Sequence, residues 1–443
     1  KFRDEIVLEI DSWASSNLFM RGVNWASALE AAIRLIALFF VWELLHSLDL
    51  LKSEVKQRWL KLIELHCLFI SRNFSRYSSA NNHLIGEAAG LFVGSLYWPC
   101  LPKADVWREK SFQILVKEID RQAYPDGGNK EQAFAYLGFV LDFFLLAALV
   151  GEANGQKFPT SYWGHIERMM DFLASIMDVG GNVPKIGDED DGNVIVLDDS
   201  LGFSNYRSIL ATGAVLFDCS DWASKAEALD QKTLWLLGGR AIEWWKRYEA
   251  LSPDVHKPQV CFSKSGYYIL GENFNARDEF RVLVDAGPLG YLSICAHGHA
   301  DALSFVLSVA GREMIVDPGT YSYHTKEIWR NYFRGTSAHN TVRIDGQDQS
   351  TMGGPFMWLK KAITSIDKLV QDSAGNVERL VANHDGYRRM KDPVKHRRAF
   401  YYLQGSYKLE ILDEILADQE HEIEVFFHFH PAVEAQYYSE GIV

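Results

Sequence analysis

The sequence predicts an α+β multidomain fold in which a helical part is followed by an antiparallel β part. With 443 residues, the chain is longer than one ordinary hydrophobic core accommodates, so two or three domains are expected. In the first half, apolar residues recur at three- and four-residue spacing, which is typical of amphipathic helices. After residue 257, apolar and polar residues alternate and β-branched and aromatic types become frequent, which is typical of strands.

Helices are predicted, in chain order, over residues 25–46, 53–74, 83–97, 104–122, 130–151 and 160–178, with a further helical stretch near 222–250. Segments rich in Pro, Gly, Asn or Ser separate them, such as "WPCLPKAD" and "AYPDGGNK". Short connections favour antiparallel helical hairpins, and the chain has no sequence repeat of fixed period. The most apolar stretches, 31–45 and 134–150, are short or carry charged residues, so we expect core helices and no membrane span.

Strands are predicted within residues 259–272, 279–287, 303–319, 339–347, 397–416 and 421–431. The change in pattern near 250–257 divides the chain into a helical domain, 1–252, and an antiparallel β-sandwich domain, 253–443, which ends as if cut at its C-terminus. A ligand is expected in a cleft between two such domains.

The composition limits the kinds of partner. A net charge of −13 argues against nucleic acid, which requires a basic surface. The 13 Trp, 19 Tyr and 26 Phe fill cores, and such rings also suit sugar surfaces. Five scattered cysteines without a CxxC pair predict buried free thiols and no disulfide framework.

The stretch "AHGHADALSF" places His297 and His299 two residues apart, on one face if they lie on a strand. Asp317 follows the next predicted strand in "IVDPG", and His339 precedes another in "SAHNTV". Histidine and aspartate side chains at strand ends can converge on a divalent metal such as zinc. Taken singly, each histidine is equally well explained as a satisfied core or surface residue, and Asp317 as a turn cap.

The helical part contains a second group of candidates. In "NNHLIGEAAG", Asn81 or Asn82 suits a helix N-cap, and His83 lies near a helix N-terminus, where anions are favoured. Tyr136 lies on an apolar helix and is by default a core residue. The acidic loop "GDEDDG", 187–192, does not match an EF-hand and is interpreted as a solvated or cleft-lining loop.

Together, "AHGHADALSF", "IVDPGTY", "RNYFRGTSAHNTVRIDG", "GVNWASALEAAIR" and "NNHLIGE" resemble the heparinase II/III-like polysaccharide lyases over Asn24 to Gly346. The resemblance implies an incomplete (α/α) toroid followed by an antiparallel β-sandwich domain. It also implies cleavage of an acidic, uronate-containing polysaccharide by β-elimination, with glycosaminoglycans and alginate among the family's substrates.

The resemblance also implies roles for residues. Asn82 and His83 look like the donors that hold the substrate carboxylate, while Tyr136 and His297 look like the catalytic acid and base. The remaining candidates fall into two groups: expected substrate-binding residues Glu87, Gln132, Arg330 and Arg334, and expected ligands of a structural Zn²⁺, His299, Asp317 and His339.

One residue departs from the family pattern, because Leu137 stands where many relatives have histidine after the tyrosine. If Tyr136 is a base, its pKa must be lowered, and Arg330 and Arg334 are candidates for that task or for binding a carboxylate. Two alternatives remain open: a glycoside hydrolase using carboxylates such as Glu87 and Glu131, and a glycan-binding or assembly protein without catalysis. Related lyases are commonly exported, so a periplasmic or secreted location is expected.

Overall fold

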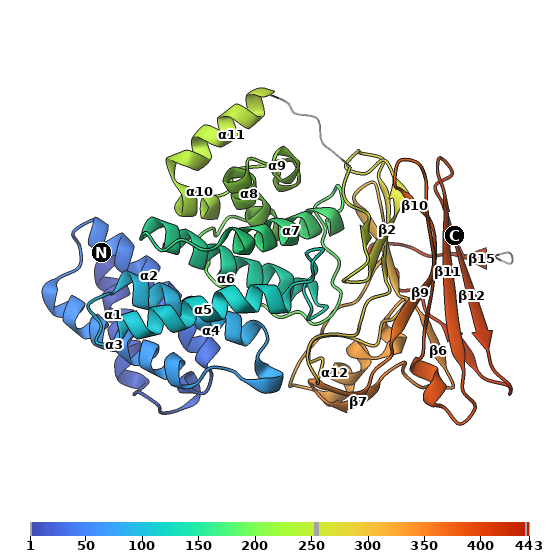
Figure 1. Cartoon of the computed structure of the whole chain (residues 1–443), viewed down its shortest axis with the longest axis horizontal. Coiled ribbons are helices and arrows are strands. Elements are labelled where there is room, and N and C mark those ends of the chain that lie inside the picture. Colours follow the sequence, from blue (N-terminus) through green and yellow to red (C-terminus); the bar gives the residue numbers. More distant parts are fainter. Residues whose placement is uncertain (1, 252–256, 439–440, 443) are drawn as a thin grey trace. The chain divides into compact units, whose positions relative to one another are not determined.

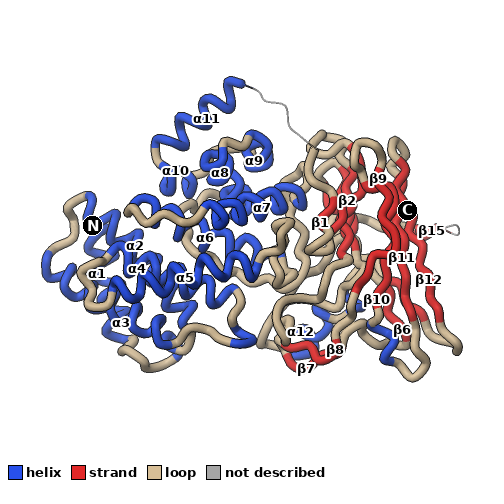
Figure 2. The backbone as a smooth tube through the Cα atoms, viewed as in Figure 1, coloured by secondary structure: helices blue, strands red, loops and turns tan. Residues whose placement is uncertain are grey.

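The computed structural model describes residues 2–251, 257–438 and 441–442. It confirms the predicted order of a helical part followed by a β part (Figures 1 and 2). The chain divides into two compact units. Unit 1 contains Lys1–Gln122, Phe139–Ile166 and Gly192–Asp199, and unit 2 contains Ala123–Gly138, Glu167–Asp191 and Ser200–Val443. The predicted boundary between 252 and 253 lies outside the described residues, and the division at that point stays a prediction, as does closure of the helices into a toroid.

The helices follow the predicted ranges closely. Their bounds are α1 Phe2–Ser16, α2 Ala28–Ser47, α3 Ser53–Arg72, α4 Asn82–Tyr97, α5 Ala104–Gln122, α6 Phe134–Ala153, α7 Thr160–Ile176, α8 Asn205–Phe217, α9 Ser220–Ala226, α10 Gln231–Leu237, α11 Gly239–Leu251 and α12 Glu327–Arg334. Short 3₁₀ turns occur at Val23–Trp25, Tyr77–Ser79, Thr336–Ala338 and Gly386–Arg389.

Two differences from the predicted helices have local causes. The stretch near 222–250 is broken into α9, α10 and α11, because Glu227 and Gly238 adopt positive φ angles of 67° and 57°. α6 begins at Phe134 instead of residue 130, because Gln132 has φ 55° in a turn. α1, α8 and α12 were not predicted from the sequence.

The core of unit 1 forms around α4, which packs against α2, α3 and α5. Nearly all of α4 is buried. At Gly90, an added Cβ would lie 2.7 Å from Cα of Ala32, so only glycine allows α2 and α4 to approach this closely. α6 is long and apolar enough to cross a membrane, but 83% of its most apolar window is buried inside the protein, as expected of a core helix.

The strands of unit 2 form one large sheet and three small ones. The large sheet has the order β12-β11-β10-β2-β3-β4-β5, with β1 paired to β2 and β9 paired to β10. The bounds of these strands are β1 Cys261–Phe262, β2 Tyr267–Glu272, β3 Phe280–Asp285, β4 Phe305–Val309, β5 Arg312–Ile315, β9 Thr364–Gln371, β10 Val377–His384, β11 Lys395–Leu403 and β12 Lys408–Leu416. The small sheets pair β6 Val342–Ile344 with β13 Ile423–Val425, β7 Thr351–Gly354 with β8 Met357–Lys360, and β14 Tyr437–Tyr438 with β15 Gly441–Ile442.

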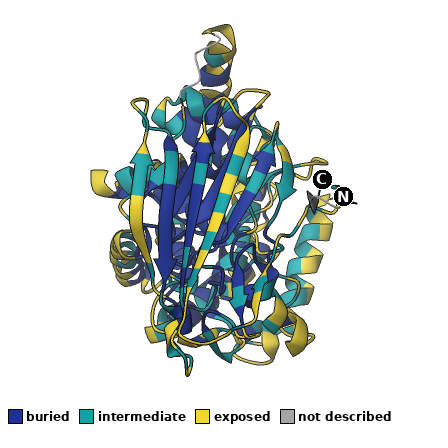
Figure 3. Cartoon of the chain, turned by 90° about the vertical axis from the view of Figure 1, so that its right-hand side faces the viewer, coloured by how far each residue is buried: buried dark blue, intermediate teal, exposed yellow. Residues whose placement is uncertain are grey.

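The sheet is antiparallel, as predicted, with one exception: β10 and β2 pair in parallel through Val377 and Leu270. β2 and β3 are buried along their whole length, whereas β12 alternates between exposed and half-buried residues. Figure 3 shows both kinds of strand in the sheet. β7, β8, β9, β10, β14 and β15 were not predicted from the sequence.

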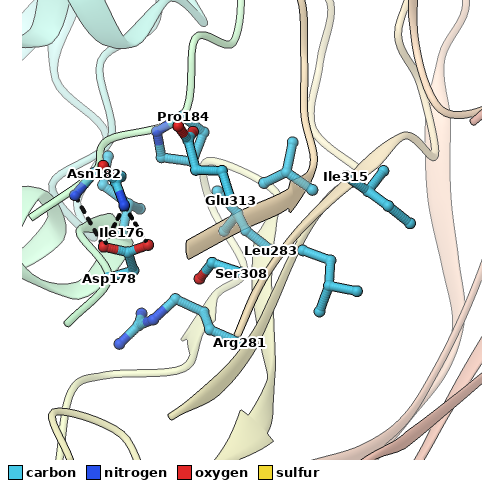
Figure 4. Close-up of a pocket in the computed structure, with 11 residues that line it drawn as sticks. Ile176, Asp178, Asn182, Pro184, Arg281, Leu283, Ser308, Glu313 and Ile315 are labelled. Atoms are coloured by element: carbon cyan, nitrogen blue, oxygen red, sulfur yellow. Dashed lines mark hydrogen bonds between the residues drawn. The ribbon is translucent and has the colours of Figure 1, made fainter. Parts of the chain in front are cut away.

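Unit 2 also contains the small cavity drawn in Figure 4, between β3, β4, β5 and the segment after α7. Arg281, Asp178 and Glu313 contribute its polar lining. Its volume of about 20 Å³ has room for roughly one water molecule. This cavity is therefore too small for a sugar ring, and the candidate active site lies elsewhere in unit 2.

Candidate active site

The centre of the candidate site is the carboxylate of Asp188, which the sequence had placed in a solvated or cleft-lining loop. Gly187 allows the loop to take this position for two reasons. Its φ is +75°, and its Cα lies so close to the backbone of Gln132 that an added Cβ would be 2.5 Å from the carbonyl oxygen of that residue. The backbone N–H of Asp188 donates to the carbonyl of His297 at 2.9 Å. The Asp188 side chain is completely buried in unit 2.

Four side chains donate hydrogen bonds to this carboxylate. His297 donates from Nδ1 at 3.1 Å, His299 from Nε2 at 2.9 Å and Thr320 from its hydroxyl at 3.1 Å. Arg330 donates from both terminal nitrogens, Nη2 at 2.7 Å. Burial acts to raise the pKa of Asp188, but the hydrogen bonds from the two histidines and Arg330 outweigh it and hold the pKa well below its ordinary value.

Asp188 therefore fixes the tautomers of both histidines. A carboxylate only accepts hydrogen bonds, so the ring nitrogen that faces it carries the proton. In neutral His297 this leaves Nε2 unprotonated, 3.7 Å from a carboxylate oxygen of Glu131. In neutral His299 it leaves Nδ1 unprotonated, and this atom has no hydrogen-bond partner among the described residues. Burial acts to lower the pKa of His297, but the hydrogen bond with Asp188 and the charge of Glu131 outweigh it and raise the pKa above its ordinary value.

Tyr136 lies directly against His297, and the catalytic roles that the resemblance implies for both residues stay predictions. The two ring centroids are 4.1 Å apart at an interplanar angle of 32°. The Tyr136 hydroxyl lies 3.3 Å from a carboxylate oxygen of Asp190 and 3.2 Å from the hydroxyl of Tyr323. Burial, together with Tyr323 and Asp190, raises the pKa of Tyr136 above its usual value. This is the opposite of the shift that a tyrosine base needs, and it keeps the phenol protonated at neutral pH.

His299, Asp317 and His339 come together as a possible metal site, with one ligand atom from each lying within 4.8 Å of the others. All three residues are buried. His339 Nδ1 and a carboxylate oxygen of Asp317 are 2.7 Å apart, while Nε2 of His339 and Nδ1 of His299 have no hydrogen-bond partner among the described residues. Leaving two buried imidazole nitrogens unpaired is unfavourable, and a metal ion would satisfy them, so the residues fit a metal.

Asn82 and His83 begin α4, as predicted, in unit 1. The N-cap is Asn81, whose side chain accepts from the backbone N–H of His83 at 3.3 Å. The cap role considered for Asn82 therefore belongs to its neighbour. Because Asn82 and His83 belong to unit 1 and the Tyr136–His297 pair to unit 2, their joint role stays a prediction.

The four residues expected to bind substrate are all buried and have partners in the fold. Glu87 accepts from the backbone N–H and the hydroxyl of Ser75 at 2.6 and 2.7 Å. Gln132 donates to the carbonyl of Ser265 at 3.0 Å. Arg330 binds Asp188, and Arg334 donates to the carbonyl of Pro355 at 2.9 Å. Their expected role in substrate binding stays a prediction, while the structure gives each a structural one.

Comparison with known proteins agrees with this architecture. Residues 1–210 match the family described as heparinase II/III N-terminus, and residues 255–442 match heparinase II/III-like, C-terminal. The chain is 26% identical over 361 residues to a heparin-sulfate lyase of Bacteroides stercoris, covering 79% of this chain and 46% of that protein. It is also 26% identical over 364 residues to a heparin-sulfate lyase of Bacteroides thetaiotaomicron, covering 80% and 46%.

The chain thus spans about half the length of the curated relatives it matches. A crystal structure of heparinase III superposes with a TM-score of 0.70 at 18% identity, covering 99% of this chain and 63% of that one. At this identity the superposition shows a shared fold.

Replacing Asp188 by asparagine tests its central role. Asp188→Asn leaves the buried Arg330 charge without its partner, so we expect a loss of roughly 3–5 kcal/mol in the free energy of unfolding. Asp191→Asn is the matched control, because Asp191 is an exposed residue of the same loop. Denaturant titration of both variants measures the difference, and equal stability of the two would show that the Asp188 carboxylate does not hold the site together.

Glu87 makes unit 1 sensitive to pH. Burial raises its pKa from 4.5 to about 7, so its stabilising contribution is complete below pH 4.5 and is lost as pH rises through about 7. Glu87→Gln keeps the shape and does not titrate. We expect the variant to gain stability over the wild type between these pH values, reaching about 3 kcal/mol at alkaline pH.

Chemical denaturation at pH 5 and pH 8 measures this gain. Glu109→Gln, at an exposed position of α5, is the control and should show little dependence on pH. A Glu87→Gln variant whose advantage does not grow with pH would contradict the raised pKa.

Proposed function

The chain belongs to the heparinase II/III-like family, and on that premise we propose that it cleaves a uronic-acid-containing polysaccharide by β-elimination. The observation that carries the proposal is the contact between Tyr136 and His297, in which Asp188 orients the imidazole. β-Elimination needs one group that accepts a proton and a second that donates one at a nearby position, and this pair offers both.

In the proposed reaction, His297 Nε2 takes the proton from C5 of the uronate, and the C5–H electrons form the C4–C5 double bond. The C4–O4 bond breaks, and the Tyr136 hydroxyl gives its proton to the departing O4. The raised pKa of Tyr136 keeps it in the protonated form that this role needs. Tyr323, whose hydroxyl lies 3.2 Å away, can donate to the resulting phenolate oxygen.

Removing the C5 proton places additional negative charge on the substrate carboxylate, so donors must stabilise that group as charge develops. Asn82 and His83 are the proposed donors, on the strength of the family pattern in "NNHLIGE". The position of His83 in the first turn of α4 supports this role, because the N-terminal end of a helix favours anions.

We propose further that His299, Asp317 and His339 bind Zn²⁺ as a structural ion. Two imidazoles and a carboxylate are a donor set that zinc accepts, and all three are buried. When bound, the ion would supply a fixed positive charge that joins the segments around residues 299, 317 and 339. An ion that fixes His299 would also help to fix Asp188, because His299 Nε2–H donates to the Asp188 carboxylate that orients His297.

We also propose a periplasmic or secreted location, because related lyases are commonly exported. Among substrates, the curated relatives' names favour heparan sulfate and heparin, and the first assay should include hyaluronan, chondroitin and alginate as well.

Absorbance of the new C4–C5 double bond tests the reaction. We expect ultraviolet absorbance to rise with at least one uronate polymer, and His297→Ala to reduce turnover by about 10²- to 10⁴-fold while polymer binding persists. Reducing ends that appear without this absorbance would indicate a glycoside hydrolase. Binding of a polymer without either signal would indicate a glycan-binding protein.

Metal analysis tests the proposed zinc site without relying on activity. The purified protein should contain about one zinc per chain, and His299→Ala should lose it together with part of its thermal stability. His46→Ala, at an exposed position of α2, is the control and should keep the metal. Unchanged zinc content in His299→Ala would show that the assignment of ligands is wrong.

A further inference from the structure

α12 is amphipathic in the reverse of the usual sense. Arg330 and Arg334 are its buried residues, whereas Ile328 is 75%, Trp329 42% and Tyr332 41% exposed. Charged side chains are rarely buried and aromatic ones rarely displayed together unless a partner requires it. The buried side has its partners in Asp188 and in the carbonyl of Pro355. The exposed side presents its apolar and aromatic side chains to solvent without such partners among the described residues.

On this exposed side, three exposed aromatic rings and the partly buried ring of Phe333 lie in contact with one another. Tyr321, 63% exposed, stacks on Phe333 with centroids 5.9 Å apart at 22°. Trp329 lies 6.0 Å from Tyr321 and 6.1 Å from Tyr332, and Tyr332 lies 5.3 Å from Phe333. We refer to Tyr321, Trp329, Tyr332 and Phe333 as the α12 aromatic face.

We propose that the α12 aromatic face is a binding subsite for sugar rings of the polysaccharide, a proposal that rests on the proposed function. The C–H groups of a pyranose carry slight positive charge and pack against the negative faces of aromatic rings. The hydroxyls of Tyr321 and Tyr332 add hydrogen-bonding groups. The surface therefore offers apolar ring faces to the C–H face of a pyranose and polar groups to its hydroxyls.

Continuity with the candidate active site supports a glycan as the occupant. The same segment that carries the aromatic face also supplies Tyr323, which lies against Tyr136, and Arg330, which binds Asp188. The short segment from Tyr321 to Phe333 therefore contributes both to the candidate active site and to the aromatic face, and all of it belongs to unit 2.

The size of the face argues against a protein partner. An eight-residue helix is about 12 Å long, whereas a stable protein interface takes roughly 20–30 residues from each side. The α12 aromatic face suits a narrow ligand, and a polysaccharide chain is one.

Affinity electrophoresis in gels that contain heparan sulfate, alginate or a neutral polysaccharide tests the proposal. All variants are made in full-length protein carrying His297→Ala or, as a second inactive background, Tyr136→Phe, so that polymer is not degraded. Trp329→Ala should weaken binding roughly threefold to tenfold, and Trp329→Phe should restore most of it. Ile328→Ala is the matched control, since it shortens an exposed apolar side chain of the same turn without removing a ring.

Equal binding by Trp329→Ala and the parent, or equal losses in Trp329→Ala and Ile328→Ala, would overturn the proposal. A parent protein that self-associates through Trp329 in sedimentation experiments would make the face an interface between copies instead. Failure of the proposed function is distinguishable: binding that depends on Trp329 without cleavage by the wild type contradicts the lyase alone. If the wild type cleaves the polymer and Trp329→Ala binds it as tightly as the parent does, the aromatic face alone is contradicted. A protein that binds none of the polymers contradicts both proposals.

Discussion

One buried negative charge, that of Asp188, organises the candidate active site. It receives hydrogen bonds from two histidines, a threonine and an arginine that lie more than 100 residues downstream. A lone buried carboxylate is strongly unfavourable, and so is a lone buried guanidinium. Asp188 and Arg330 therefore stabilise each other only in the assembled site, where the same carboxylate also sets the proton positions on His297 and His299. Folding and the orientation of both imidazoles depend on the same interaction.

A second fully bonded residue, Asn340, holds the segments around the metal triad. Its side-chain amide donates to the carbonyls of Phe305 and Val316 at 2.8 and 2.9 Å, and its backbone N–H donates to Ser304 at 3.0 Å. Its own carbonyl accepts from Arg398 at 2.6 Å. Val316 precedes Asp317 and Asn340 follows His339, so these bonds place two of the three candidate ligands before any ion binds. Such support from residues around the ligands is what a metal site requires.

Local pattern predicted much of this architecture, and long-range pairing accounts for what it missed. α2, α3 and α5 follow from apolar periodicity, because each packs one face against α4, which is itself buried nearly all round. β9 is mostly exposed and lacks the alternation that identifies a strand. His299, Asp317 and His339 come together as predicted for a metal triad, although His299 lies outside the strands and β5 and β6 belong to different sheets. Asp188 was missed because it lies 109 residues from His297 and no spacing connects them. Arg330 looked like a surface or substrate-binding residue because its partner, Asp188, lies 142 residues away in the sequence.

The interleaving of the two units has an evolutionary consequence. Unit 2 takes in 123–138 and 167–191 from the helical half before the chain reaches its first strand, and these segments carry Tyr136 and Asp188. Recombination near residue 252 would therefore separate the tyrosine and the carboxylate from the histidine that they contact. Neither half alone contains both partners of the contact between Tyr136 and His297. Changes on one side of that junction must be matched by changes on the other, which ties the two halves into one heritable module.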